Sequence, residues 1–271
     1  MTLWEAFWLG LLQGVTEFLP ISSSGHLVLL HAFFGIEEGA LSYDVFLHVA
    51  TLLAVLGYFW RDWMNLFAGG FRMVRDRTTA DRDGRMLLFV ILATVPAAVL
   101  GLLAADEIES LFHGAEEGPS RVGVMFLMTG LLLLFAERLA KHTRPMEKMG
   151  WRDAGIIGLF QAMALLPGVS RSGATMIGGL FLGLKRADAA RFSFLMAAPI
   201  TGGAALVKVP ELLNLGQFSV GALVIGFVAS FLSAILCIHY LLKLLQRHTF
   251  LPFAYYLIGL GVVTVGVMMF Y

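Results

Sequence analysis

The stretch EFLPISSSGHL, residues 17 to 27, interrupts two apolar runs at residues 3 to 19 and 26 to 34. Pro20 lacks an amide hydrogen, so it ends or kinks a helix. A helix needs about 20 residues to cross the hydrocarbon core of a bilayer, and neither run is that long. Irregular backbone at membrane depth must be covered by protein or reached by water. The stretch therefore predicts a re-entrant pair of short helices.

The composition predicts an all-α polytopic membrane protein. Of the 271 residues, 58% are hydrophobic and 14% are charged, and the mean hydropathy is +0.81. Soluble domains carry about a quarter charged residues, so this apolar surface needs a membrane. The net charge is zero, and no nucleic-acid partner is expected. The single cysteine, Cys237, excludes an internal disulfide and a cysteine metal cluster.

A second break, LPGVSRSG at residues 166 to 173, repeats the first at a displacement of 148 residues. The identical pairs are Gly10 and Gly158, Leu11 and Leu159, Gln13 and Gln161, Ser22 and Ser170, Ser24 and Ser172, and Gly25 and Gly173. VFLHVA at 45 to 50 likewise resembles SFLMAA at 193 to 198. These matches indicate an internal duplication.

The duplication predicts the topology. Each copy would hold one re-entrant pair and three spans, an odd number, so the second copy must enter the membrane in the opposite orientation. We therefore expect six transmembrane helices plus two re-entrant helix pairs. They would form a single membrane domain, residues 1–271, made of two inverted repeats at about 1–140 and 150–271.

The charges in the loops predict the orientation. Basic residues gather between Arg61 and Arg85, and between Lys141 and Arg152, which predicts that these loops are cytoplasmic. The alternate loops carry the acidic residues Glu37, Glu38, Asp44, Asp106, Glu107, Glu109, Glu116 and Glu117. Both termini are therefore expected outside the cytoplasm.

Each break is followed by the first turn of a helix, and this first turn is a predicted phosphate-binding site. The first amides of a helix lack partners inside it, and the helix dipole adds positive charge there. The first phosphate-binding site would use Ser22, Ser24 and Gly25, and the second would use Ser170, Ser172 and Gly173. Arg171 could contact phosphate oxygens through two nitrogens at once. Two phosphate-binding sites side by side suggest a diphosphate ligand. The alternative is that the serines only cap the helices.

Two ionisable groups accompany the first break. Gln13 and Glu17 share a helix face, and a carboxylate in an apolar helix needs a cation, a metal or a proton. Beside a diphosphate the two would bind Mg²⁺ or Ca²⁺, and a structural ion pair between Glu17 and Arg171 is the alternative. His26 follows the serines and can act as an acid or a base. His48 has no comparable neighbours in sequence, so a structural role is expected.

QGVTEFLPISSSGH and LPGVSRSGAT resemble the two signature regions of the undecaprenyl-diphosphate phosphatase family, which is associated with bacitracin resistance. The resemblance covers essentially the whole chain. It implies a phosphoric anhydride hydrolase of the bacterial inner membrane, which converts undecaprenyl diphosphate to undecaprenyl phosphate and inorganic phosphate and so recycles the lipid carrier of cell-wall synthesis. Bacitracin would then compete for the lipid and not for the protein.

The resemblance also implies site residues. By position, the acidic element of the family falls on Gln13 and Glu17, its serine and histidine stretch on Ser22, Ser23 and His26, and its third element on Pro167, Gly168, Ser170, Arg171, Ser172 and Thr175. Gln13 stands where some members have Glu. Glu17 is thus expected to be the charged ligand of the divalent cation.

We expect Arg171 and the helix N-termini to hold the diphosphate, while Ser23 attacks the terminal phosphorus with His26 as its base. Direct attack by His26 or by water stays open. The resemblance implies a site that opens to the periplasmic or outer face. The competing function is a polyprenyl-phosphate flippase, because an inverted repeat with an anion site at mid-membrane would suit transport too. The oligomeric state stays open, a homodimer included.

Overall fold

The computed structural model describes residues 1–35, 40–110 and 118–270. The α-helices of this part of the chain are α1 (Leu3–Phe18), α2 (Ser23–Phe34), α3 (Ala40–Tyr58), α4 (Trp60–Arg75), α5 (Arg82–Ser110), α6 (Gly118–Leu139), α7 (Trp151–Met163), α8 (Arg171–Phe181), α9 (Arg186–Val207), α10 (Val209–Leu212), α11 (Val220–Leu244) and α12 (Leu251–Phe270). Two short 3₁₀ helices are η1 (Met146–Lys148) and η2 (Leu213–Gln217).

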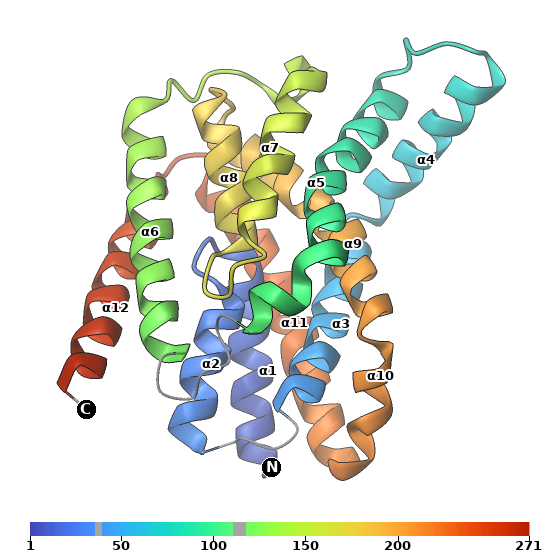
Figure 1. The fold of residues 1–271 in the computed structure, drawn as a ribbon. Helices are drawn as coiled ribbons and strands as arrows, with labels where there is room; N and C mark the ends of the chain where they lie inside the picture. The colour runs from blue at the N-terminus through green and yellow to red at the C-terminus, as the bar shows by residue number, and fades with distance from the viewer. Residues whose placement is uncertain (36–39, 111–117, 271) are drawn as a thin grey trace.

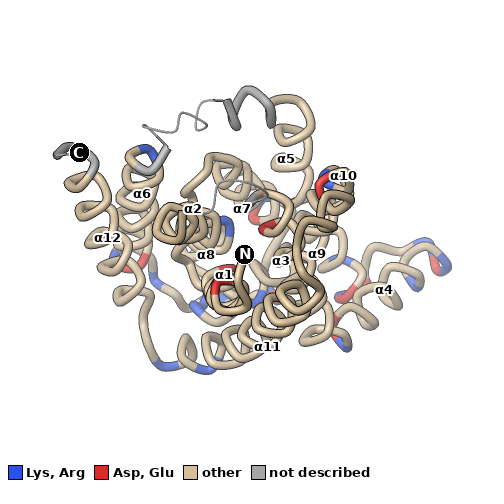
Figure 2. The backbone as a smooth tube through the Cα atoms, turned by 90° about the horizontal axis from the view of Figure 1, so that it is seen from below, with Lys and Arg blue, Asp and Glu red and all other residues tan. Residues whose placement is uncertain are grey.

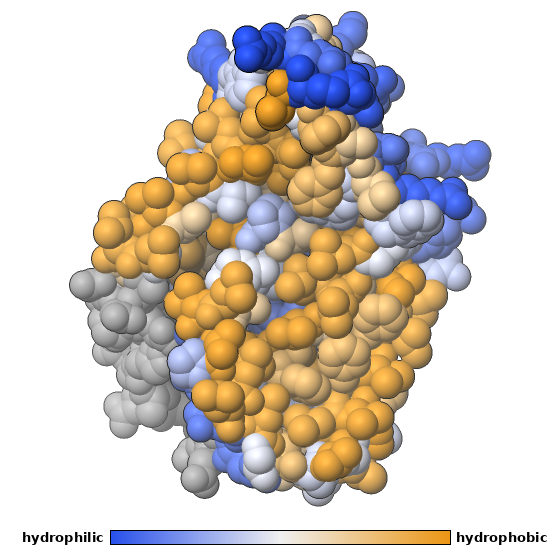
Figure 3. All heavy atoms as spheres, turned by 90° about the vertical axis from the view of Figure 1, so that its right-hand side faces the viewer, coloured by the Kyte–Doolittle hydropathy of each residue, from blue (hydrophilic) through white to orange (hydrophobic). Residues whose placement is uncertain are grey.

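Five of these helices, α3, α5, α6, α9 and α11, are long and apolar enough to cross a membrane. The prediction of an all-α polytopic membrane protein is thereby confirmed. The sixth predicted span, residues 250 to 271, corresponds to α12, whose described apolar part Leu251–Val267 is shorter. A broad hydrophobic belt covers the side of the molecule, and hydrophilic residues gather at its upper end (Figure 3).

The break predicted at Pro20 separates α1 from α2. Thr2 and Glu5 form a capping box at the start of α1, and Ser22 caps α2, which ends at Gly35 with a φ of 65°. At 1.5 Å per residue, a helix of 12 residues such as α2 is only about 18 Å long. The two helices thus form a hairpin too short for two full spans.

The second break makes a matching hairpin. Helix α7 ends at Met163, Gly168 adopts a φ of 92° in the connection, and Ser170 caps α8. The two hairpins approach from opposite ends of the molecule, and their connections meet near its centre (Figure 1). The Ser172 hydroxyl of the second hairpin donates to the Leu19 carbonyl of the first at 2.7 Å.

Each hairpin packs against a long helix from the other half of the chain. A Cβ added at Gly10 of α1 would stand 2.3 Å from the Gly226 carbonyl oxygen of α11. A Cβ added at Gly158 of α7 would stand 2.7 Å from the Ala93 carbonyl oxygen of α5. Glycine is therefore needed at both positions, because the backbones approach too closely for a side chain.

The segment from Arg61 to Arg85, interpreted as a loop, instead contains α4 and the start of α5. Helix α4 lies outside the bundle and carries charges of both signs (Figure 2). Its exposed apolar residues are Trp60, Met64, Phe67, Phe71 and Val74. Counting charges missed this helix, because its apolar residues recur at helical spacing between the charged ones.

The start of α1 and the end of α12 lie toward the same end of the molecule (Figure 1). This placement agrees with two termini on one side of a membrane. The acidic loop residues Glu37, Glu38, Glu116 and Glu117 lie outside the described residues, as do the side chains of Asp106, Glu107 and Glu109. The predicted charge of those loops is therefore known from the sequence alone.

Candidate active site

Glu17 lies where the two hairpins meet, with only 8% of its surface exposed. One of its oxygens, Oε1, accepts a hydrogen bond from Arg171 Nη2 at 2.6 Å. The other, Oε2, accepts from the Ser23 hydroxyl at 2.6 Å and from Gln13 Nε2 at 3.1 Å. The structure thus brings four predicted site residues together, and the ion pair that was the alternative role of Glu17 is present. Such donors compensate a buried carboxylate for its lost hydration.

The backbone at Ser22 turns the first serines in different directions. Ser22 has a φ of 71°, which costs a residue with a side chain about 1–3 kcal/mol, and its hydroxyl caps α2 at the Gly25 amide. Ser23 then reaches Glu17, whereas Ser24 is exposed. A Cβ at Gly25 would stand 2.5 Å from the Phe126 ring, so glycine permits this close approach.

The hydroxyls of the second hairpin have structural partners. Ser170 caps α8 at the Gly173 amide, at 2.9 Å. Ser172 binds the first hairpin, as described above, and Thr175 donates to the Ser193 hydroxyl of α9 at 2.7 Å. Capping, the alternative role of the serines, therefore describes Ser22 and Ser170 as the structure has them.

His26 contacts a residue that the sequence did not single out. Its Nδ1 lies 2.7 Å from the Ser22 carbonyl oxygen, and its Nε2 lies 2.7 Å from the Tyr256 hydroxyl. A carbonyl only accepts, so Nδ1 carries the proton of the neutral ring and Nε2 accepts from Tyr256. Both side chains are described, and the structure records no hydrogen bond between His26 and Ser23. The tyrosine lies in the apolar run of α12, where only its hydroxyl distinguishes it.

His48, for which the sequence predicted a structural role, lies beside the buried carboxylate of the site. Its Nε2 lies 3.6 Å from Glu17 Oε2, while its Nδ1 lies 2.7 Å from the Asp44 carbonyl oxygen of its own helix. The duplicated sequence contained a signal that could have singled out His48. His48 of VFLHVA stands where the second copy, SFLMAA, has Met196.

Gln13 and Glu17 offer the donors that a hard divalent cation prefers. The Gln13 Oε1 atom is buried and has no hydrogen-bond partner, although the amide nitrogen beside it binds Glu17. Mg²⁺ is commonly held by one or two carboxylates together with substrate phosphates. Among the described residues, no three His, Cys, Asp or Glu side chains form a cluster that could hold a metal alone. The two side chains thus fit a cation that the substrate helps to bind.

Comparison with known proteins agrees with the two motifs. The family model described as bacitracin resistance protein BacA matches residues 6–263. A relative from Marinobacter nauticus named undecaprenyl-diphosphatase is 43% identical, over 99% of this chain and 100% of its own length. Relatives of the same name from Gemmatimonas aurantiaca and Rubrobacter xylanophilus are 41% and 42% identical, over 97% and 99% of both chains. The chain therefore belongs to the bacitracin resistance protein BacA family.

Proposed function

We propose that this chain is an undecaprenyl-diphosphatase, which hydrolyses undecaprenyl diphosphate to undecaprenyl phosphate and inorganic phosphate. Full-length similarity to relatives of that name supports the activity. The observation that carries it is the buried contact of Glu17 with both Arg171 and Ser23. The guanidinium of Arg171, the hydroxyl of Ser23 and the carboxylate of Glu17 therefore lie together near the starts of α2 and α8.

The substrate headgroup would bind between the starts of α2 and α8. Both helices begin at the junction of the two hairpins, and helix N-termini favour anions. Arg171 binds Glu17 through one terminal nitrogen, and its other terminal nitrogen lies 3.4 Å from the Ser193 carbonyl oxygen. Its guanidinium therefore retains donors for two phosphate oxygens.

We propose Ser23 as the nucleophile. Its oxygen would form a bond to the terminal phosphorus as the bridging P–O bond breaks, which releases undecaprenyl phosphate. The hydroxyl already donates to Glu17, so this carboxylate can take the proton, and a loose phosphoryl transfer requires positioning more than a strong base. Water would then attack the phosphoserine, with His26 Nε2 taking its proton once it exchanges the Tyr256 hydroxyl for that water, and the Ser23–phosphorus bond would break to release inorganic phosphate while Glu17 returns its proton to Ser23. Trapping the phospho-enzyme and identifying the modified residue separates Ser23 from His26 and from direct attack by water.

A divalent cation, Mg²⁺ or Ca²⁺, would be held by Glu17 and Gln13. When bound, it would neutralise charge on the phosphate oxygens. The buried Gln13 Oε1 without a partner supports this proposal. Arg171 would still be needed with the cation bound, because its planar guanidinium supplies two parallel N–H donors that a metal ion does not.

Chelation with EDTA is expected to abolish phosphate release, and added Mg²⁺ or Ca²⁺ to restore it. Gln13→Glu should lower the cation concentration needed for half-maximal release, because a second carboxylate strengthens the site. Both effects are measured by phosphate release from the purified enzyme. Release that EDTA leaves unchanged would contradict the cation and leave the ion pair with Arg171 as the role of Glu17.

We propose six membrane spans and two re-entrant hairpins in two inverted repeats. The helix order supports this, since α1, α2 and α3 correspond to α7, α8 and α9, and each hairpin packs on a long helix of the other half. The basic loops would face the cytoplasm of a bacterial inner membrane. The first hairpin would then enter from the outer face, to which the site would open.

A cysteine at Ser24, in a Cys237→Ala background, tests this orientation. Ser24 is exposed at the start of α2, so a membrane-impermeant thiol reagent should modify it from the outer face of intact cells. A diphosphate analogue should protect it. Labelling only in inverted vesicles would reverse the orientation, and labelling without protection would separate this turn from substrate binding.

Phosphate release by the pure protein in detergent tests the function itself. A flippase moves its lipid between two compartments, and a detergent micelle has no second compartment. Release of inorganic phosphate from undecaprenyl diphosphate is therefore the result we expect of an enzyme. Binding of polyprenyl phosphate without any release would favour the flippase.

A further inference from the structure

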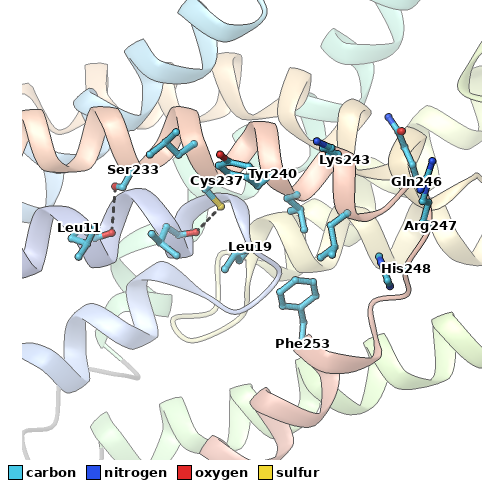
Figure 4. A pocket seen from close by; sticks show the side chains of 14 residues that line it. Leu11, Leu19, Ser233, Cys237, Tyr240, Lys243, Gln246, Arg247, His248 and Phe253 are labelled. Carbon is cyan, nitrogen blue, oxygen red and sulfur yellow. Dashed lines mark hydrogen bonds between the residues drawn. The ribbon is translucent and has the colours of Figure 1, made fainter.

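A groove of about 840 Å³ runs along α1 and α11 to the start of α12 (Figure 4). Its wall on the α1 side is formed by Leu11, Val15 and Leu19, the residue that follows the end of the helix. At 100° per residue these three share one face of α1, and Gln13 and Glu17 share the opposite face. The groove is therefore separate from the candidate active site, although both use α1.

The groove has the length of one lipid leaflet. Its lining on α11 extends from Ser233 to Leu244, which at 1.5 Å per residue is about 16 Å. This is roughly half of the ~30 Å hydrocarbon core. Ser233 and Cys237 donate to carbonyls of α1 and so join the two helices along its floor (Figure 4). The lining between the two ends is mostly apolar and suits one acyl chain.

Polar and basic residues gather at one end of the groove. Lys243, Gln246, Arg247 and His248 line that end, and all four are exposed (Figure 4). Within the described ranges, the structure records no ion pair for Lys243 or Arg247. Two cations without counter-ions beside an apolar groove are complementary to an anionic lipid headgroup.

Two arginines at this end of the molecule, by contrast, are paired with carboxylates. Arg186 binds the buried Glu137, and Arg144 binds Asp153. Those pairs neutralise both partners within the fold. What sets Lys243 and Arg247 apart from other exposed charges such as Lys141 and Arg152 is their place on the lining of the groove.

We propose that this groove binds one anionic phospholipid, with its phosphate at Lys243 and Arg247 and one acyl chain along α1 and α11. Basic pockets between membrane helices are known to hold anionic headgroups on the cytoplasmic side. The proposed orientation places this end of the groove in the cytoplasmic leaflet. The lipid site does not depend on the phosphatase activity.

Native mass spectrometry of the full chain in detergent, with added phosphatidylglycerol or phosphatidylcholine, tests the headgroup contact. The wild-type protein should bind phosphatidylglycerol more tightly than phosphatidylcholine, because only the first carries a net negative charge. Each basic side chain near the headgroup should strengthen lipid binding about fivefold in the dissociation constant. Lys243→Gln with Arg247→Gln should therefore weaken phosphatidylglycerol binding by about 25-fold. Binding of phosphatidylcholine should not change.

The matched control removes the same charges elsewhere, through Lys141→Gln with Arg152→Gln. Both side chains are exposed and neither lines the groove. This variant should bind phosphatidylglycerol as the wild type does. An equal loss in the two double variants would overturn the site, because general attraction to the charged surface would then explain the binding.

A second pair of variants tests the acyl chain. Leu236 and Leu232 are both exposed on α11, and only Leu236 lines the groove. Leu236→Trp should fill the groove and weaken phosphatidylglycerol binding several-fold, whereas Leu232→Trp should not. Equal binding by these two variants would overturn the chain placement.

Competition tests the source of the phosphate. Neither inorganic phosphate nor undecaprenyl phosphate, at equimolar concentration, should displace phosphatidylglycerol from the wild-type protein. Displacement by undecaprenyl phosphate would overturn the phospholipid assignment in favour of a site for the reaction product. Displacement by inorganic phosphate would overturn the role of the acyl chain.

Discussion

Arg171→Lys is expected to reduce phosphate release by about 100- to 1,000-fold, the cost of losing a directed donor at developing charge. Lysine keeps the positive charge beside Glu17 but loses the planar fork that binds two oxygens at once. The fold should persist, because a cation still faces the buried carboxylate. Turnover per folded molecule, measured with the purified variant, checks the expectation. Turnover near that of the wild type would remove Arg171 from the centre of the mechanism.

Arg186→Lys is the matched control. Arg186 also binds a buried glutamate, Glu137, through two nitrogens, at the end of the molecule away from the hairpin connections. The lysine there should lower the melting temperature and leave turnover per folded molecule close to the wild-type value. A large loss of turnover in both variants would indicate that arginine pairs support the fold without a special role for Arg171.

Glu17→Gln is expected to have the second large effect. The substitution leaves Arg171 charged without its partner and removes the carboxylate that accepts from Ser23. Breaking one side of a buried ion pair costs about 3–5 kcal/mol, so the free energy of unfolding should fall together with phosphate release. Thermal melts and phosphate assays separate the two effects.

Glu137→Gln controls for the loss of stability. Glu137 is buried, pairs with Arg186 and accepts from the Phe250 amide. Its substitution should destabilise the fold by a similar amount while the folded fraction keeps its turnover. If Glu17→Gln likewise keeps its turnover per folded molecule, Glu17 acts only in folding.

Local chemistry made the two breaks predictable. Pro20 and Pro167 cannot donate to a helix, and the serines after them cap the next helix, so helix ends follow from a few adjacent residues. The contact of Gln13 with Glu17 also follows from helical spacing. The pairing of Glu17 with Arg171 was anticipated only as an alternative, because 154 residues separate the two in sequence.

The missed contacts have a common physical reason. His48 and Tyr256 reach the site from other helices, and the direction in which a helix turns its side chains depends on packing that no local pattern records. Comparison of the two repeats would have found His48. Four residues of the site stand where the copies differ: Glu17, Ser23, His26 and His48 are opposite Leu165, Arg171, Ala174 and Met196. The matched positions include the glycines and capping serines of both hairpins and also Gln13, so the difference between the copies marks part of the proposed site and not all of it.

The close contact of Gly10 with Gly226 bears on the order in which the protein is made. The two glycines are 216 residues apart, so at roughly 5–20 residues per second α1 is synthesised ~10–40 s before α11. Until then α1 can pack only against α2 and α3, lacks its largest partner surface, and is too short to cross the membrane alone. A chain truncated after α10 should therefore leave α1 open to protease, and one extended through α11 should protect it. Glu17 would reach its final position only when most of the chain has been synthesised. An incomplete chain would therefore lack an assembled site for the lipid substrate.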